Sequence, residues 1–201
     1  PGFGSIRLRT AWSGNSLYYH LYHNDVDYRQ FDSESIENSL YNTVMMDLNA
    51  GERSRLRLRA DFNRHDAGIS DLARDEGYHH LRNEGSVMLS AYREAGRRWV
   101  IHALLRQEWA DGKWLPVMPS AGFRFRILES RSLYLKGNLS RNYNLPSLND
   151  LYWIPGGNPD LKPESSLGGD MALDLTLSRA GMSLQASLHA YANWVEDWIL
   201  W

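Results

Sequence analysis

Hydrophobic and polar residues alternate with a period of two over most of the chain. The sharpest run extends from Arg55 to Asn63 and separates an apolar row from a charged one: Leu56, Leu58, Ala60 and Phe62 against Arg55, Arg57, Arg59 and Asp61. Successive side chains of a strand point to opposite faces of a sheet, so this run predicts a strand with one apolar and one polar face. Similar runs along the chain predict about ten strands and an all-β fold.

The predicted strands are joined by connections that alternate in length. Short turns are expected near Gly14, Gly51, Gly96, Ser130 and Ala180, and longer loops near Asp32, Ala73, Gly112 and Pro155. The first turn, at residues 13–15, predicts a hairpin, whereas the irregular segments 24–37 and 64–83 predict long loops. An antiparallel meander places successive connections at opposite ends, and bacterial outer-membrane barrels have tight turns at one end and long loops at the other.

The polar face of the predicted sheet carries charge along its middle and must therefore contact water. No stretch approaches the roughly 18 apolar residues of a spanning helix, but strands of about ten residues suit a tilted crossing of the hydrocarbon layer. An open sheet edge in lipid leaves backbone groups unpaired, so the strands must close on themselves or belong to a larger barrel. We therefore expect an antiparallel transmembrane β-barrel meander. The alternative is a soluble β-sandwich binding module, in which the apolar rows would form a shared core.

Composition is compatible with the membrane interpretation and with a soluble β-protein, and it excludes other classes. The chain has 201 residues, among them eight Trp and eleven Tyr, and in membrane proteins such rings gather at the bilayer interfaces. It has no Cys, which excludes a disulfide framework and thiolate metal sites. The net charge is −2 and the basic residues are spread over many strands, which argues against a nucleic-acid partner.

The most specific motif is carried by a proline-containing loop between an alternating run that ends near Asn142 and another that begins after Glu164. Ser-Arg at the end of a strand is followed by a Pro, then Leu-Tyr, then Gly-Asn-Pro-x-Leu-x-Pro-Glu. This order resembles a segment in the second half of the barrel of TonB-dependent outer-membrane receptors. The matching residues are Ser140, Arg141, Pro146, Leu151, Tyr152, Gly157, Asn158, Pro159, Leu161, Pro163 and Glu164.

The resemblance implies a 22-stranded barrel that is filled by an N-terminal plug domain. Residues 1–201 would then be a partial barrel domain without the plug, the region that touches TonB, and the closing strands. It further implies the outer membrane of a Gram-negative bacterium and active, TonB-driven uptake of a scarce large nutrient such as a ferric siderophore, cobalamin or a glycan. A passive porin-like channel is the alternative among outer-membrane proteins. Both ends of the chain look cut, since it starts at Pro1 without a signal peptide.

Two groups of residues are candidates for binding. An aromatic cluster in a long extracellular loop could stack on a ligand, or it could fold back into the interfacial girdle: Tyr152, Trp153 and Ile154. Five arginines that face the lumen on the alternation pattern are expected to contact carboxylates and carbonyls of the missing plug: Arg55, Arg57, Arg59, Arg124 and Arg126.

The chain contains no nucleophile elbow, phosphate-binding glycine loop or zinc-protease motif, so we expect no enzyme activity and no cofactor. His65, His79 and His80 are of a type that binds transition metals, but no third ligand stands at a suitable spacing. We expect them to be exposed loop histidines. The acidic segment 25–37 lacks the central Gly of calcium-binding loops and predicts a solvated loop.

Overall fold

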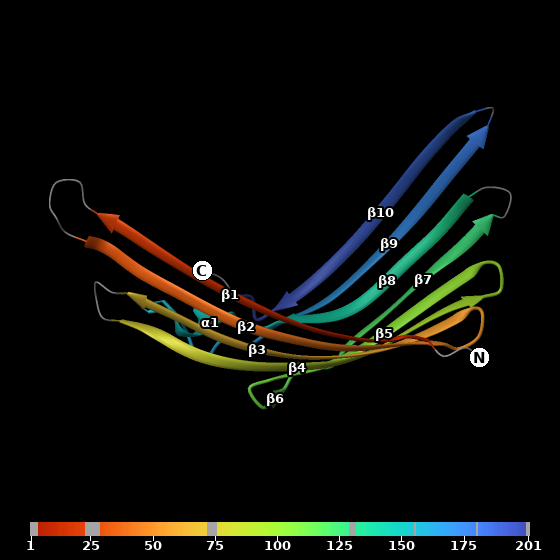
Figure 1. Ribbon diagram of the computed structural model, residues 1–201. Helices are drawn as coiled ribbons and strands as arrows, with labels where there is room; N and C mark the ends of the chain where they lie inside the picture. The colour runs from red at the N-terminus through yellow and green to blue at the C-terminus, as the bar shows by residue number, and fades with distance from the viewer. Residues whose placement is uncertain are drawn as a thin grey trace.

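The computed structural model describes residues 4–22, 29–71, 76–128, 132–154, 156–179 and 181–199, with the side chains of 20–22, 29–32 and 179 left aside. Its described part is dominated by one antiparallel sheet. The strands are β1 (Ile6–Tyr22), β2 (Arg29–Asn49), β3 (Ser54–Asp71), β4 (Glu76–Ala95), β5 (Trp99–Ala110), β6 (Lys113–Trp114), β7 (Met118–Leu128), β8 (Ser132–Asn144), β9 (Glu164–Arg179) and β10 (Met182–Glu196). Figure 1 shows them as a single curved layer.

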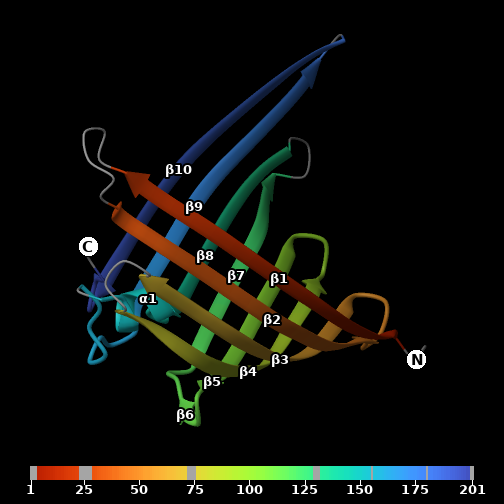
Figure 2. The same cartoon turned by 60° about the vertical axis from the view of Figure 1, so that its left-hand side comes forward.

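The strand order is β1-β2-β3-β4-β5-β7-β8-β9-β10, with the two-residue β6 paired to β5. Neighbours along the chain are therefore neighbours in the sheet, which confirms the predicted antiparallel meander of about ten strands. The layer bends into a trough whose sides are β1 and β2 on one side and β9 and β10 on the other (Figure 2). We call its hollow side the concave face and its opposite side the outer face.

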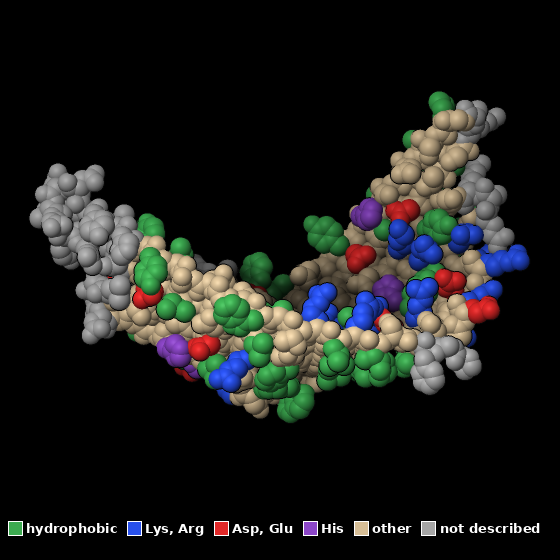
Figure 3. Space-filling model, in the orientation of Figure 1, with side chains coloured by type: hydrophobic (Ala, Val, Ile, Leu, Met, Phe, Trp, Pro, Cys, Tyr) green, Lys and Arg blue, Asp and Glu red, His purple; other side chains and the backbone are tan. Residues whose placement is uncertain are grey.

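Apolar side chains form continuous rows across the outer face. Strand register aligns Ile6, Met46, Leu58, Leu89 and Leu105 on five successive strands. Four of these side chains are between 42% and 66% exposed: Ile6, Leu58, Leu89 and Leu105. Figure 3 shows hydrophobic side chains along the underside of the trough and many Lys and Arg side chains in its hollow. Large exposed apolar patches of this kind require an apolar environment.

The sandwich alternative is wrong, because the sheet has no second layer to pack against among the described residues. Leu56 and Leu173, which a sandwich would bury in its core, are 37% and 38% exposed. In the described part of the chain, the buried hydrophobic residues are limited to Met118 and Ala172. The free energy of burial must therefore come from the medium around the outer face instead of from a protein core.

The predicted hairpin at residues 13–15 is wrong. Strand β1 continues through Gly14, which pairs with Asn38 of β2. The glycine is required for another reason: a Cβ at this position would lie 2.8 Å from the Trp12 ring, which covers the backbone there. Ladder hydrogen bonds to β2 thus override the local turn preference of Ser-Gly-Asn.

The two predicted long loops are also largely wrong. Strand β2 begins at Arg29, so most of segment 24–37 is extended, and its first residues lie outside the described part. Segment 64–83 belongs to β3 and β4, which pair residue by residue, with His65 opposite Arg82, up to residues 71 and 76. Positions 72–75, which include the predicted loop centre at Ala73, are not described.

The hydrophobic pattern did not predict these strand ends because both of their faces are mostly polar, with Leu81 and Ile69 as isolated apolar residues. Arg64, Asp66 and His79 follow Phe62 and Val87 on the outer face, where the apolar rows have ended. A strand with two wet faces does not alternate in hydrophobicity, although its backbone pairs as usual. The β3–β4 hairpin therefore extends past the apolar band.

The short turns 50–53 and 96–98 were predicted correctly, and each has a glycine with positive φ, Gly51 at 95° and Gly96 at 67°. They lie at one end of the sheet. The opposite end carries the 111–117 connection, which contains β6, and the 145–163 loop. The predicted turns near Ser130 and Ala180 connect β7 to β8 and β9 to β10, and these two positions are not described.

The loop 145–163 contains the helix α1 (Leu148–Tyr152). A reciprocal capping box starts it: Asp150 N donates to Ser147 Oγ at 3.1 Å, and Ser147 N donates to Asp150 Oδ2 at 2.6 Å. This short turn holds the loop in one conformation at its N-terminal end. No helix in the described residues is long and apolar enough to cross a membrane.

Candidate functional site

The concave face carries arginines that are paired with carboxylates of neighbouring strands. Asp47 of β2 accepts from Arg7 Nη2 of β1 at 2.6 Å and from Arg57 Nε of β3 at 2.6 Å. One carboxylate thus ties three strands together. The Arg57 side chain is still 45% exposed, so it remains accessible from the hollow.

A second carboxylate centre lies further along the same strands. Asp61 accepts hydrogen bonds from Arg59 Nε at 2.9 Å, Thr43 Oγ1 at 2.7 Å and Ser86 Oγ at 3.0 Å. These partners come from β2, β3 and β4, so this part of the wall is a connected polar network. Such a network needs contact with water on its open side.

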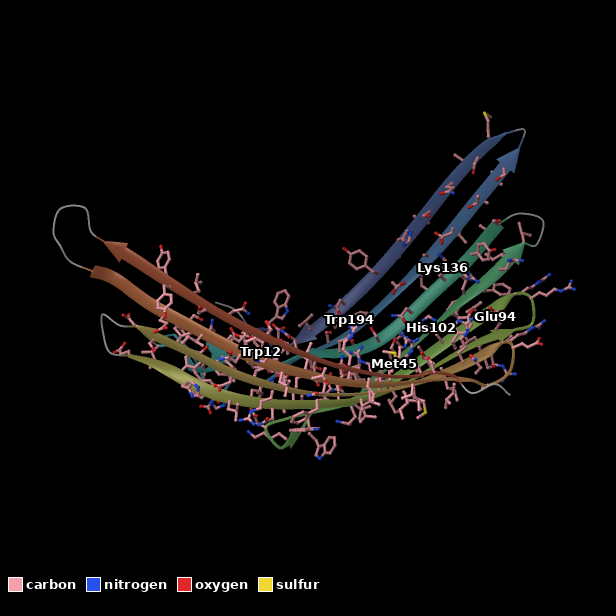
Figure 4. All side chains as sticks on the ribbon, in the orientation of Figure 1. Trp12, Met45, Glu94, His102, Lys136 and Trp194 are labelled. Atoms are coloured by element: carbon pink, nitrogen blue, oxygen red, sulfur yellow. The ribbon has the colours of Figure 1, made fainter. Side chains whose placement is uncertain are left out.

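The other predicted arginines lie over tyrosine rings. The Arg55 guanidinium is 5.9 Å from the centre of the Tyr92 ring, and those of Arg124 and Arg126 are 5.4 and 5.3 Å from the Tyr134 ring. All five predicted arginines share the concave face by strand register, in two groups on β3 and β7. Figure 4 marks Glu94, His102 and Lys136 along the same wall.

The N-terminal half of the long loop crosses the hollow and contacts β4, which β5 and β7 separate from β8 in the sheet. We call residues 145–154 the strap. Arg82 Nη1 of β4 donates to the Pro146 carbonyl at 2.9 Å, and the Tyr78 hydroxyl donates to Asn149 Oδ1. The rings of His80 and Tyr152 stack at 4.3 Å. Three alternate residues of β4 therefore hold the strap.

Arg82 is the centre of this contact because it is charged and buried, with 9% of its surface exposed. Its guanidinium lies 3.9 Å from carboxylates of both Glu84 and Asp111. A buried charge needs partners, and here the strap carbonyl is the partner at hydrogen-bonding distance. Moving the strap would therefore remove a hydrogen-bond partner from the buried Arg82 guanidinium, so the position of the strap and the solvation of Arg82 are coupled.

A cavity of about 340 Å³ lies between the strap and the concave face. In its wall, His65 Nδ1 is 2.8 Å from the Ser39 hydroxyl, which also donates to Glu37 Oε1 at 3.0 Å. Polar and aromatic side chains line the cavity together: Glu37, His65, Tyr78, Arg82, Glu84 and Asn149. We call this space the vestibule.

The predicted ligand residues take different positions in the strap. Tyr152 lies on the concave side against Tyr78 and His80, whereas Ile154 is 47% exposed. Trp153 is half-buried, and its carbonyl accepts from Gly157 N at 2.5 Å in a turn that leaves no room for a Cβ at Gly157. Of the three, Ile154 is therefore the most accessible to a ligand.

Sequence reasoning missed Tyr78 and Arg82, and it gave His80 no role in holding the strap. A signal was present, since polar residues at 78, 80, 82 and 84 alternate with period two. The pattern is polar on this face without an apolar row opposite, and so it predicted a loop. Nothing in the local sequence indicates that their partners come from residues 146–152.

The expectation that the three histidines lie in loops is wrong, because all of them lie on strands. His79 is exposed as expected, whereas His65 and His80 are half-buried. His79 points to the outer face, with Nε2 2.7 Å from Asp66 Oδ1, whereas His65 and His80 are on the concave side. Adjacent residues of a strand face opposite ways, so His79 and His80 have no common ligand position. The described residues contain no group of three His, Asp or Glu side chains that could hold a metal ion.

A one-layer antiparallel meander with a charged hollow, an apolar outer face, tight turns at one end and a folded loop at the other is the wall of a transmembrane barrel. Residues 3–201 match the family model described as TonB dependent receptor-like, beta-barrel. The chain belongs to this family.

Curated relatives match over a shorter part of the chain. The vitamin B12 transporter BtuB of Vibrio vulnificus is 39% identical over 59 residues, which are 29% of this chain and 9% of that protein. Its namesake from Photobacterium profundum is 33% identical over 69 residues, covering 34% of this chain and 11% of the relative. The matched segments thus span about a tenth of these relatives.

Solved structures extend the likeness to nearly the whole chain at low sequence identity. The copper transporter OprC superposes with a TM-score of 0.76 and 12% identity over 96% of this chain and 37% of its own. The siderophore receptor PirA from Pseudomonas aeruginosa superposes with a TM-score of 0.64 and 13% identity, over 92% of this chain and 39% of its own. These two structures share the fold.

Proposed function

We propose that the chain is part of the barrel of an outer-membrane receptor that takes up a scarce large nutrient by TonB-dependent active transport. The observation that carries this proposal is the family match over residues 3–201. The names of the similar proteins suggest cobalamin, a ferric siderophore or copper as the transported nutrient. A glycan is a further candidate. Cobalamin is the first to test, because both curated relatives are vitamin B12 transporters.

The proposed partners follow from the two faces of the sheet. Lipid of a Gram-negative outer membrane covers the exposed apolar rows, and a plug domain of the same protein fills the hydrated hollow. TonB acts through a region outside the present residues. The protein is proposed to be a transporter and not an enzyme, and a charged concave wall with its own carboxylate partners does not call for nucleic acid.

The ligand is proposed to enter at the strap end and to contact Tyr152, Trp153 and Ile154. Tyr152 serves in this proposal as the anchor of the strap, while Ile154 and the open edge of Trp153 touch the ligand. Apolar and aromatic side chains on a loop supported by a rigid sheet suit the binding of a large, partly apolar nutrient.

Uptake measured in cells that express the complete receptor tests this proposal. Cobalamin or siderophore should accumulate only when TonB is present, and Ile154→Ala should weaken ligand binding several-fold while the amount of receptor stays constant. Uptake that persists without TonB would support the passive channel instead. Arg53→Ala, on the short turn at the opposite end, serves as the control for the loop variant.

Charge reversal of Arg57 and Arg59 tests the proposed contact with the plug. Exposed ion pairs are individually weak, so a plug held by them can move during transport. In the complete receptor, the double variant Arg57→Glu with Arg59→Glu should reduce uptake and expose the plug to protease. The barrel should stay folded, as shown by unchanged heat-modifiable mobility in electrophoresis.

The reversal also repels Asp47 and Asp61 of the wall, so a control must separate the two effects. Arg7→Glu, Asp47→Lys and Asp61→Lys, added together to the double variant, restore opposite charges within the wall but not toward the plug, because Asp47 also pairs with Arg7. If uptake and plug protection are unchanged in the double variant, the arginines only solvate the wall.

A further inference from the structure

The outer face has an apolar furrow of about 520 Å³ that crosses β5, β7, β8 and β9. The floor of the furrow is formed by Ala121 of β7 and Gly137 of β8, which leave space because they are the two smallest residue types. A Cβ on Gly137 would lie 2.6 Å from Met171 Sδ and 2.8 Å from Phe123 Cε1, so these two side chains lean over the glycine. Larger apolar residues form the walls: Trp99, Ile101, Phe123, Leu139 and Met171.

One end of the furrow has the character of a bilayer interface. Trp99 is the first residue of β5, directly after the 96–98 turn, and its ring lies 4.4 Å from that of Phe125 and 5.8 Å from that of Phe123. Tryptophan prefers the headgroup level, where its ring is partly apolar and its N–H is hydrated. The furrow therefore runs from the interface into the apolar layer.

A cationic side chain, that of Arg93, lies beside this end of the furrow. Arg93 of β4 pairs in register with Ile101, so it lies on the same outer face, one strand spacing of about 4.8 Å from the furrow wall. It is exposed. A long cationic side chain on an otherwise apolar face can extend to the headgroup level. An amphiphile with an anionic head and an apolar chain matches both features at once.

We propose that this furrow binds one glycerophospholipid, with its phosphate on Arg93 and an acyl chain along Ala121 and Gly137. The inference rests on the membrane location given by the proposed function. It goes beyond general solvation by lipid, since it predicts one retained molecule and names the side chains that select it. Phosphate binds arginine through charge-assisted hydrogen bonds, which are about twice as strong as neutral ones.

Native mass spectrometry of the complete receptor tests the proposal. The protein, purified in dodecyl maltoside, is mixed with phosphatidylglycerol, and the occupancy of the first bound lipid is measured. Arg93→Gln should reduce lipid affinity about tenfold, because a hydrogen bond to a charged group is lost. Ala121→Leu, which fills the furrow, should abolish the first site. Matched controls are Arg97→Gln on the nearby turn and Ala186→Leu on the outer face of β10, and both should bind as the parent does.

Other results assign the furrow differently and overturn the inference. Equal lipid occupancy in all variants indicates unselective lipid, and a lipid-free dimer that Ala121→Leu dissociates indicates a second copy of the chain. If Ala121→Leu fails to fold, the lipid occupancy of Arg93→Gln compared with that of Arg97→Gln still tests the proposed site. An inserted receptor that retains no lipid contradicts this inference alone, whereas a protein that dissolves without detergent contradicts the proposed function.

Discussion

Replacing Leu188 by arginine is expected to prevent stable insertion of the complete receptor, while Ser187→Arg is expected to insert normally. Leu188 pairs with Leu173 and is 72% exposed on the outer face. An arginine on the lipid-facing side costs about 2–4 kcal/mol near the bilayer midplane. Ser187 faces the hollow, where its hydroxyl donates to Asp174 Oδ1 at 2.8 Å, so an arginine there gains a carboxylate neighbour in water.

Refolding of both variants into lipid vesicles, followed by electrophoresis without heating, measures this difference. The comparison is internally matched, because adjacent residues of one strand receive the same side chain at nearly the same depth. Equal insertion of the two variants would show that β10 does not contact lipid, and failure of Ser187→Arg alone would show that the faces have been assigned in reverse.

Replacing Arg82 by alanine is expected to release the strap. The side chain is buried, and its loss removes a charged hydrogen bond to the Pro146 carbonyl. Such a bond contributes about 1.5–3 kcal/mol, so opening of the strap should become about 10- to 100-fold more frequent. Hydrogen exchange of residues 147–153 in the complete receptor should accelerate accordingly, whereas exchange in β5 and β7 should not change.

Two further variants make the Arg82 experiment decisive. Tyr152→Ala removes the stacking on His80 from the strap side and should also accelerate exchange, although it leaves Arg82 in place. Arg64→Ala, at a neighbouring strand position on the outer face, should have no effect. Unchanged exchange in both strap variants would mean that the capping box at Ser147 and Asp150 holds the loop without β4.

Alternation along the chain was sufficient to assign the two faces of the strands. The row of Leu56 and Leu58 was predicted to oppose the arginines of β3, and strand register places the two sets on opposite faces. This was possible because a strand has a geometric period of two that does not depend on its neighbours. The motif in 140–164 was likewise sufficient to name the family, since its Pro and Gly positions are local requirements.

Strand length could not be predicted in the same way. Glycine and polar residues near Gly14, from Arg64 to Asp71 and from Glu76 to Asn83 have strong local preferences for turns and loops, yet they lie within β1, β3 and β4. Pairing along a preceding strand supplies backbone hydrogen bonds that outweigh such preferences, and it leaves no trace in the hydrophobic pattern when both faces are wet. Only the assembled sheet decided where these strands end.

The sequence by itself determined which side chains face lipid and which face water, because that property repeats every second residue. The tertiary structure alone decided what each of them contacts. Arg82 and Pro146 are 64 positions apart. Gly137 meets Phe123 and Met171, and Arg93 lies beside Ile101, only because β4, β5, β7, β8 and β9 lie in this order and register. Such contacts depend on register between strands, which is a collective property of the whole sheet, so neither the strap nor the furrow could be read from any one segment.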